Sequence, residues 1–326
     1  MSDLANLLVR SWALLTGGEI KMTEEQRALR ALEEKLRAIL PPEYASYEDV
    51  QPVSMGTAGL KYDAEGKVAW DEIWGSFCDL AMAGGPPHKG KLLEPATAAE
   101  VAAEPVKYRG VVEEICRGIR MVSYDVAVEG SDDAGWVRVM CPNKLMAGWI
   151  GRAIVMENVS ARVRGEVVEV PAGPGFRLPK EIKNVVTVIA KTCHYYDGHM
   201  SFEQQKKMGM IFAEMEAARP LLQPVHVGDG VDVGVVAEWK ARVGERLGLM
   251  GLGVGGAEYV GWFGIEVGSV KKAIWMMRAL VVGNVMARRE ETVLYVPVNP
   301  GMDAKGEVVC AAVSEVKRLA AARGVI

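Results

Sequence analysis

Apolar residues at helical spacing mark two segments at the start of the chain. The first covers Leu4–Leu15. The second begins at Thr23, where Gln26 three residues later completes a capping box, and it runs through Leu40 until Pro41–Pro42 end it. Its many charged residues leave only a narrow apolar stripe. We therefore expect an N-terminal arm that lies on the body of the protein or on a partner subunit.

The next hundred residues contain one unusual loop. Ala45–Trp70 shows no sustained period, and a helix predicted from about Asp71 to Met82 leads into Gly84–Gly90, with the sequence GGPPHKG. Two flexible glycines followed by two rigid prolines allow the backbone to approach another group closely and then leave in a fixed direction. The loop also carries His88 and Lys89, so it is a candidate functional segment.

Two later stretches repeat one order of predicted elements, α-β-α-β-β-α. Each has a strand opening at a tryptophan, a helix, two short strands and a closing helix. In the first stretch the strands are predicted at Trp136–Met140, Ser160–Arg164 and Val167–Pro171, and the closing helix at Lys180–His194. In the second the strands are predicted at Trp262–Val267, Met286–Arg289 and Thr292–Pro297, and the closing helix at Glu307–Arg323. A helix over Phe202–Ala218, capped by Ser201, joins them.

The repetition extends to residue identity. Gly135–Pro171 and Gly261–Pro297 align without gaps at a displacement of 126 residues, with 14 identities in 37 positions. Dense identity at one displacement indicates two related structural units. We therefore predict an α+β protein with two internally duplicated, ferredoxin-like-related modules paired about a pseudo-twofold axis. The predicted parts are a helical N-terminal extension (1–104), the first repeat (105–200), a linker helix and loop (201–232) and the second repeat (233–326).

Composition narrows the class of protein. Half of the 326 residues are hydrophobic, and the net charge is −4 with a pI near 5.8, which disfavours nucleic acid as a partner. Five cysteines without a CxxC pair indicate reduced thiols. No apolar run is long enough to span a bilayer. The sequence thus predicts a cytoplasmic protein without a membrane partner, and a homo-oligomer is compatible with it.

Residues shared by the two repeats include candidates for anion binding. Arg152 and Arg278 occupy equivalent positions, and each lies six residues before a shared asparagine, Asn158 or Asn284. One interpretation is structural, since asparagine tolerates left-handed backbone near a helix end and arginine can bind the last carbonyls. The other is a clamp in which the two guanidinium groups bind a carboxylate or phosphate. The equivalent pair Arg162/Arg288 is expected to face solvent or to lie on an edge strand, and the repeated tryptophans are expected in the core.

A second cluster of polar residues follows the first closing helix. Cys193, His194, Tyr195 and His199 lie within seven positions, and the second repeat lacks them. His194 and His199 are five residues apart, which does not place them on one face of an α-helix, and no HExxH motif is present. The glycines of 251–256 match GxGxxG on paper, but a predicted helix precedes them and a strand follows, so a dinucleotide site is not expected.

Three functional hypotheses remain. In the first, a cleft between the modules binds a small anionic ligand, with Arg152, Arg278, Lys89, Tyr195 and His199 as its ligand-binding residues. The second is an enzyme acting on a small substrate, with His88 and His194 as acid and base or as metal ligands. The third is an assembly protein that oligomerises through its N-terminal helices. The sequence identifies no cofactor and no metal-binding motif.

Overall fold

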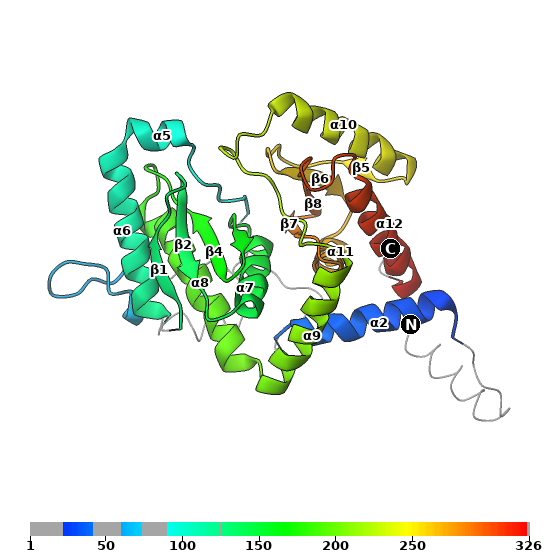
Figure 1. Cartoon of the computed structure of the whole chain (residues 1–326), viewed down its shortest axis with the longest axis horizontal. Helices are drawn as coiled ribbons and strands as arrows, with labels where there is room; N and C mark the ends of the chain where they lie inside the picture. The colour runs from blue at the N-terminus through cyan, green and yellow to red at the C-terminus, as the bar shows by residue number, and fades with distance from the viewer. Residues whose placement is uncertain (1–21, 42–59, 74–89, 124, 325–326) are drawn as a thin grey trace.

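The computed structural model describes residues 22–41, 60–73, 90–123 and 125–324. The first N-terminal helix, most of the helix predicted over 71–82, and the loop with His88 and Lys89 lie outside the described residues. In the described part, helices combine with two four-stranded antiparallel sheets, so the predicted α+β class is confirmed. Figure 1 shows the two sheets in separate halves of the molecule, with helices α2 and α9 running below them in that view.

The first sheet has the strand order β1-β2-β4-β3, and every neighbouring pair is antiparallel. Because β4 lies between β2 and β3, the β2-α7-β3 segment is a split βαβ unit. The helices of this half are α5 (Ala98–Ala103), α6 (Pro105–Val122), α7 (Lys144–Met156) and α8 (Lys183–His194). The strands are β1 (Ala127–Gly130), β2 (Trp136–Met140), β3 (Arg162–Arg164) and β4 (Val167–Pro171).

The second sheet has the order β5-β6-β8-β7. Its central register matches that of the first sheet at a displacement of 126 residues, since Trp136 pairs with Pro171 and Trp262 with Pro297. The helices here are α10 (Val233–Leu249), α11 (Val270–Val282) and α12 (Glu307–Arg323). The strands are β5 (Gly253–Val254), β6 (Trp262–Glu266), β7 (Arg288–Glu290) and β8 (Val293–Pro297).

The predicted element order lacks one strand in each half. The chain adds β1 before β2, and β5 before β6, so each sheet has four strands where three were expected. Both added strands lie at a sheet edge. In β1 only Val128 is buried, and in β5 both residues are exposed, so neither has the alternation that marks a half-buried strand. Backbone pairing to a neighbouring strand, rather than a local pattern, makes these residues strands.

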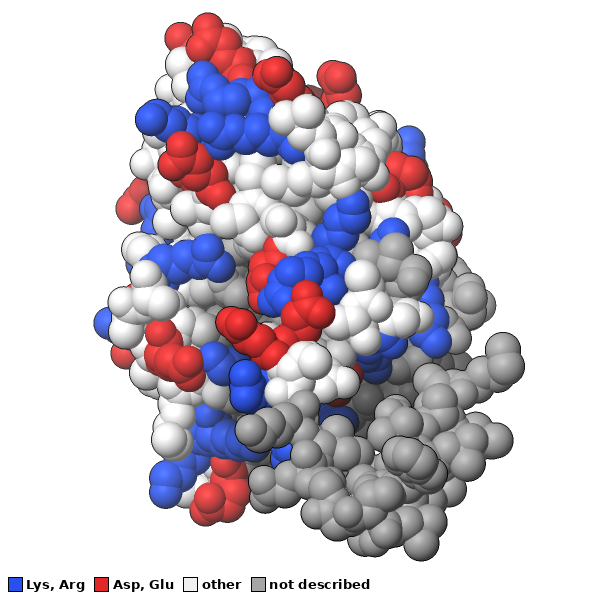
Figure 2. Space-filling model, turned by 90° about the vertical axis from the view of Figure 1, so that its right-hand side faces the viewer, with Lys and Arg blue, Asp and Glu red and all other residues white. Residues whose placement is uncertain are grey.

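The capping box at Thr23 and Gln26 is present, and α2 (Glu24–Ile39) follows it. This helix packs on α9 (Phe202–Ala218), α11 and α12, so its apolar stripe is buried within the same chain. Ion pairs join α2 to the helices beneath it, namely Lys35–Glu214, Glu25–Arg318 and Glu33–Arg323. Figure 2, which views the molecule from the right of Figure 1, shows basic and acidic side chains interspersed on that face.

Arg162 and Arg288 lie on the edge strands β3 and β7, in agreement with one alternative of the prediction, but both are buried, so the alternative that they face solvent is wrong. Arg162 stacks on Trp136 and pairs with Glu169 at 2.9 Å. Arg288 is 0% exposed, stacked against the rings of Tyr259 and Tyr295. Strand alternation directs both arginines away from the helical layer, but the rest of the chain covers that face as well.

Two connecting segments, one at Leu92–Leu93 before the first half and one at Leu222–Gln223 before the second, each contact both halves. Leu93 forms a bridge with Val159 in the first half, and the neighbouring Leu92 N–H lies 3.3 Å from the Glu290 carboxylate in the second. Leu222 forms a bridge with Val285 in the second half, and Gln223 exchanges two hydrogen bonds with the Val163 backbone in the first. Gln223 thus pairs with the open edge of β3, and Leu92 binds the same Glu290 carboxylate that pairs with Arg288.

The four cysteines in the described part of the chain are buried free thiols, as expected for reduced cysteines; they are Cys116, Cys141, Cys193 and Cys310. None of the described helices has the length and apolar character needed to cross a membrane.

Candidate functional site

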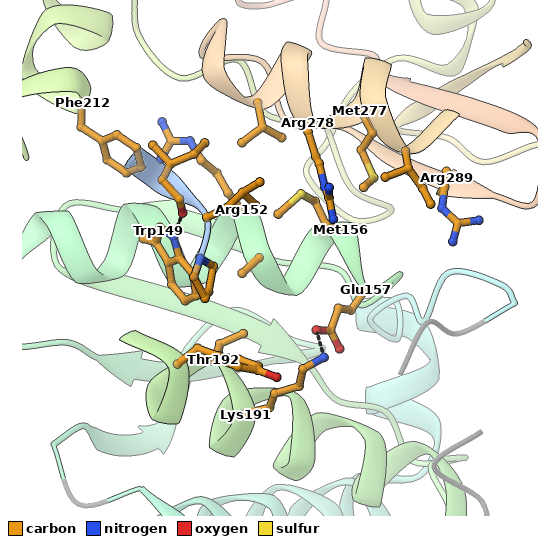
Figure 3. A pocket seen from close by; sticks show the side chains of 17 residues that line it. Trp149, Arg152, Met156, Glu157, Lys191, Thr192, Phe212, Met277, Arg278 and Arg289 are labelled. Carbon is orange, nitrogen blue, oxygen red and sulfur yellow. Dashed lines mark hydrogen bonds and ion pairs between the residues drawn. The ribbon is translucent and has the colours of Figure 1, made fainter. Parts of the chain in front are cut away.

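A pocket lies where the two halves meet α9 and the end of α2, and we call it the junction pocket (Figure 3). Its volume is about 100 Å³. It is lined by Ile39, Leu40, Pro41, Trp149, Arg152, Ala153, Met156, Glu157, Lys191, Thr192, Tyr195, Phe212, Ile274, Met277, Arg278, Val281 and Arg289.

Helical spacing accounts for most of the pocket wall. Helix α7 contributes Trp149, Ala153 and Met156, whose intervals of four and three residues place them on one face. Helix α11 contributes Ile274, Met277, Arg278 and Val281 with the same spacing. The two helices therefore present apolar faces with charged groups set among them.

Arg152 is deeply buried in the pocket wall, at 3% exposure. Its guanidinium lies 4.3 Å from the centre of the Phe212 ring and donates to the Gly148 carbonyl at 2.7 Å and to Asn284 Oδ1 at 2.5 Å. Its Nε has no hydrogen-bond partner among the described residues. Burial lowers the pKa of Arg152 to about 10, an effect that the charge of Glu216 opposes, so the side chain is still cationic at neutral pH.

Three other cationic side chains and one carboxylate line the same pocket. Figure 3 shows Arg278 pointing from α11 toward α7, with Lys191 and Glu157 on the opposite side. Lys191 and Glu157 form a buried ion pair at 2.5 Å. Arg289 is buried, and burial lowers its pKa while the charge of Glu291 raises it. Four cations against one carboxylate give the lining a formal charge of 4 − 1 = +3.

The structure places some of the predicted site residues together and others apart. Arg152, Arg278 and Tyr195 all line the junction pocket, so the two equivalent arginines do approach a common space. His194 and His199 lie beside Tyr195 but do not line the pocket. The proposed partners His88 and Lys89 lie outside the described residues.

Sequence reasoning missed the Lys191–Glu157 pair and Phe212. Lys191 occupies a core position of α8, between buried Ala190 and Thr192. A lysine within an otherwise apolar helix face is a sign of a buried ionic partner, because an isolated buried charge is costly. That sign was present in the sequence, but only the fold identifies the partner.

The expectation that His194 and His199 lie on different helix faces is wrong. After α8 the chain forms a π-helical turn over Tyr195–His199, closed by the Met200 N–H donating to the Tyr195 carbonyl at 3.2 Å. A π-turn adds one residue per hydrogen-bonded ring, so positions five apart come together. The two imidazole Nε2 atoms are 3.1 Å apart. Within the described residues, no cluster of three or more His, Cys, Asp and Glu side chains has the arrangement of a metal site.

Comparisons of the chain with protein-family models, curated proteins and solved structures found no match in any of the three.

Proposed function

We propose that the junction pocket binds a small anionic ligand with an apolar body. The observation that carries this proposal is a buried arginine, Arg152, whose Nε has no partner among the described residues and whose side chain lines the pocket. A desolvated cation is stabilised by an anion that reaches it, because Coulomb attraction is strong where water is excluded. The excess of cations over carboxylates in the lining supports the same sign of ligand charge, in a chain whose net charge is −4.

The walls and the size of the pocket favour a compact ligand. Trp149, Phe212 and Met277 provide aromatic and thioether surface, which suits a ring or a branched aliphatic group. A volume of about 100 Å³ is close to that of engineered apolar cavities, roughly 150 Å³, that hold one benzene. A nucleotide is therefore too large, and a small aromatic or branched carboxylate is the ligand class that fits.

We also propose that the two halves are copies of one module, with the pocket at their pseudo-twofold junction. The matching registers at a displacement of 126 residues support this, as do Asn158 and Asn284, which have φ of 59° and 61° at equivalent positions. Each sheet has the strand order of a ferredoxin-like module whose last edge strand has moved to the front of the chain, because β1 and β5 precede the split βαβ unit.

A comparison of acids with their neutral amides tests the ligand proposal. We expect benzoate, phenylacetate and 3-methylbutanoate to bind in ligand-observed NMR titrations, and each amide to bind at least ten-fold more weakly, since ~1.5–3 kcal/mol is typical of hydrogen bonds to charged groups. Arg278→Met should weaken binding of the acids. Arg177→Met is the matched control, because the Arg177 side chain is 61% exposed and does not line the pocket.

Two results would contradict the proposal. One is equal binding of acids and amides, which would mean that the cationic lining does not select charge. The other is unchanged binding of the acids to the Arg278→Met variant.

A further inference from the structure

The histidine pair on the π-turn is a feature that the junction pocket does not use. His194 is the last residue of α8, and His199 is the last residue of the π-turn that follows. Both side chains are half-buried, so each imidazole is packed by the protein and also reaches solvent. The His199 ring also contacts Tyr195, with the ring centroids 5.2 Å apart, and this contact restrains its orientation.

The relative orientation of the two rings is unfavourable for a simple hydrogen bond. The Nε2 atoms are 3.1 Å apart and the ring centroids 4.8 Å apart. In a straight N–H···N bond at that Nε2 separation, the centroids would be about 5.4 Å apart. The shorter centroid distance means that the two ring axes are bent relative to one another, and hydrogen bonds weaken steeply when bent.

The same geometry suits two ligands of one ion. Imidazole nitrogens bind transition metals at about 2.0–2.1 Å, so a 3.1 Å separation of the two Nε2 atoms corresponds to an angle of about 95–102° between the two metal–nitrogen bonds. Two rings that coordinate one ion at that angle have centroids about 4.8 Å apart, which agrees with the observed distance. A tetrahedral ion would need a separation of about 3.4 Å, so neighbouring positions of a square or octahedral ion fit better.

We propose that His194 and His199 form a two-nitrogen site for a divalent late transition metal of tetragonal preference, with Cu²⁺ bound more tightly than Ni²⁺ and Zn²⁺. The order follows from the affinity of nitrogen ligands across the first-row metals. Water occupies the remaining coordination positions on the solvent side. The site is independent of the proposed ligand pocket, which neither histidine lines.

Calorimetric titration of the full chain, first treated with a chelator, tests this site. We expect wild-type protein to bind one Cu²⁺ in the micromolar range, with Ni²⁺ weaker, and His194→Ala and His199→Ala to weaken Cu²⁺ binding at least ten-fold each. The electron paramagnetic resonance spectrum of the Cu²⁺ complex should show coupling to two imidazole nitrogens. His226→Leu is the matched control, because His226 is buried against the Trp136 ring, and this variant should bind Cu²⁺ as wild type does.

The outcomes that would overturn the site are distinct. They are Cu²⁺ binding weaker than about 100 µM in the wild type, unchanged affinity in either pair variant, a spectrum with a single nitrogen, or a loss in His226→Leu as large as in the pair variants. Circular dichroism of each metal-free variant establishes that a loss of binding is not a loss of folding. A further readout is the melting temperature, which Cu²⁺ should raise in the wild type and not in the double variant.

Discussion

Arg152 in the first half donates a hydrogen bond to Asn284 Oδ1 in the second, at 2.5 Å, and both residues are buried. Asn284 in turn donates from Nδ2 to the Arg219 carbonyl. Its counterpart Asn158 accepts from Arg288 at 3.0 Å and donates to the Arg289 carbonyl. The two asparagines thus serve as backbone turns in their own halves and as junction contacts between the halves.

We predict that Asn284→Ala lowers the free energy of unfolding by about 2–5 kcal/mol. The left-handed backbone at φ 61° costs an alanine roughly 1–2 kcal/mol, and Arg152 loses a buried acceptor, which costs about 1–3 kcal/mol. Urea unfolding followed by circular dichroism measures the change.

Asn284→Gly separates the two contributions, because glycine adopts the left-handed conformation without strain and still lacks the side-chain bonds. We expect it to be about 1 kcal/mol more stable than Asn284→Ala. If the two variants unfold at the same urea concentration, backbone strain at this position is negligible and our account of the turn is wrong.

The indole of Trp149 should hold the end of α2 in place. Trp149 Nε1 donates to the Ile39 carbonyl at 2.8 Å, which joins the last turn of α2 to α7. Trp149→Phe keeps an aromatic ring but removes the donor and leaves a buried acceptor unpaired, at a cost of about 1–3 kcal/mol. Hydrogen exchange of the α2 amides should accelerate by about ten-fold.

Trp136→Phe is the control for that experiment. Trp136 is buried in the first sheet, whereas α2 packs on α9, α11 and α12, so this variant should lower global stability without a selective effect on α2. Selective acceleration of α2 exchange in Trp136→Phe, or none in Trp149→Phe, would refute the assignment.

His226 should make the protein sensitive to acid. Burial lowers its pKa to about 3 from 6.5, and the charges of Arg162 and Arg164 act in the same direction. A base with a lowered folded pKa binds fewer protons than the unfolded chain, so stability is full above pH 6.5 and is lost as the pH falls toward 3. Between pH 6.5 and pH 4 the free energy of unfolding should fall by ~3 kcal/mol because of His226. The His226→Leu variant should lack this fall when its urea unfolding is measured over the same pH range.

Asp197 should have the opposite effect on the pH dependence of stability, and the same urea unfolding measures it. Partial burial raises its pKa to about 6 from 3.8, and the charge of Asp125 and a hydrogen bond to it add to the rise. An acid with a raised folded pKa stabilises the fold below pH 3.8 and loses that contribution as the pH rises to 6. Asp197→Asn should therefore gain stability relative to wild type on going from pH 4 to pH 7. Two results would contradict these pKa shifts. One is that His226→Leu loses more stability than wild type as the pH falls. The other is that Asp197→Asn gains stability relative to wild type as the pH falls.

Local sequence patterns predicted several elements with high accuracy. The helix over Phe202–Ala218 with its Ser201 cap and the closing helix over Glu307–Arg323 have the predicted bounds. The turn positions of Asn158 and Asn284 also follow from local chemistry, because few residues other than glycine adopt positive φ readily. The π-turn after α8 was not predictable in this way, since the residues that form it are compatible with an ordinary helix end.

Spacing, capping and turn chemistry act within a few residues, so the sequence by itself determined the main helices, the central strands and the likeness of two segments 126 residues apart. Contacts between distant residues determined the rest. Whether Arg162 and Arg288 meet water depends on which distant segments reach their surroundings. Asp229 pairs with Arg162, and Leu92 binds the Glu290 carboxylate that pairs with Arg288, each from more than sixty residues away in the chain. The same holds for Lys191 and Glu157, whose ion pair exists because α7 and α8 pack together and exclude water from both charges.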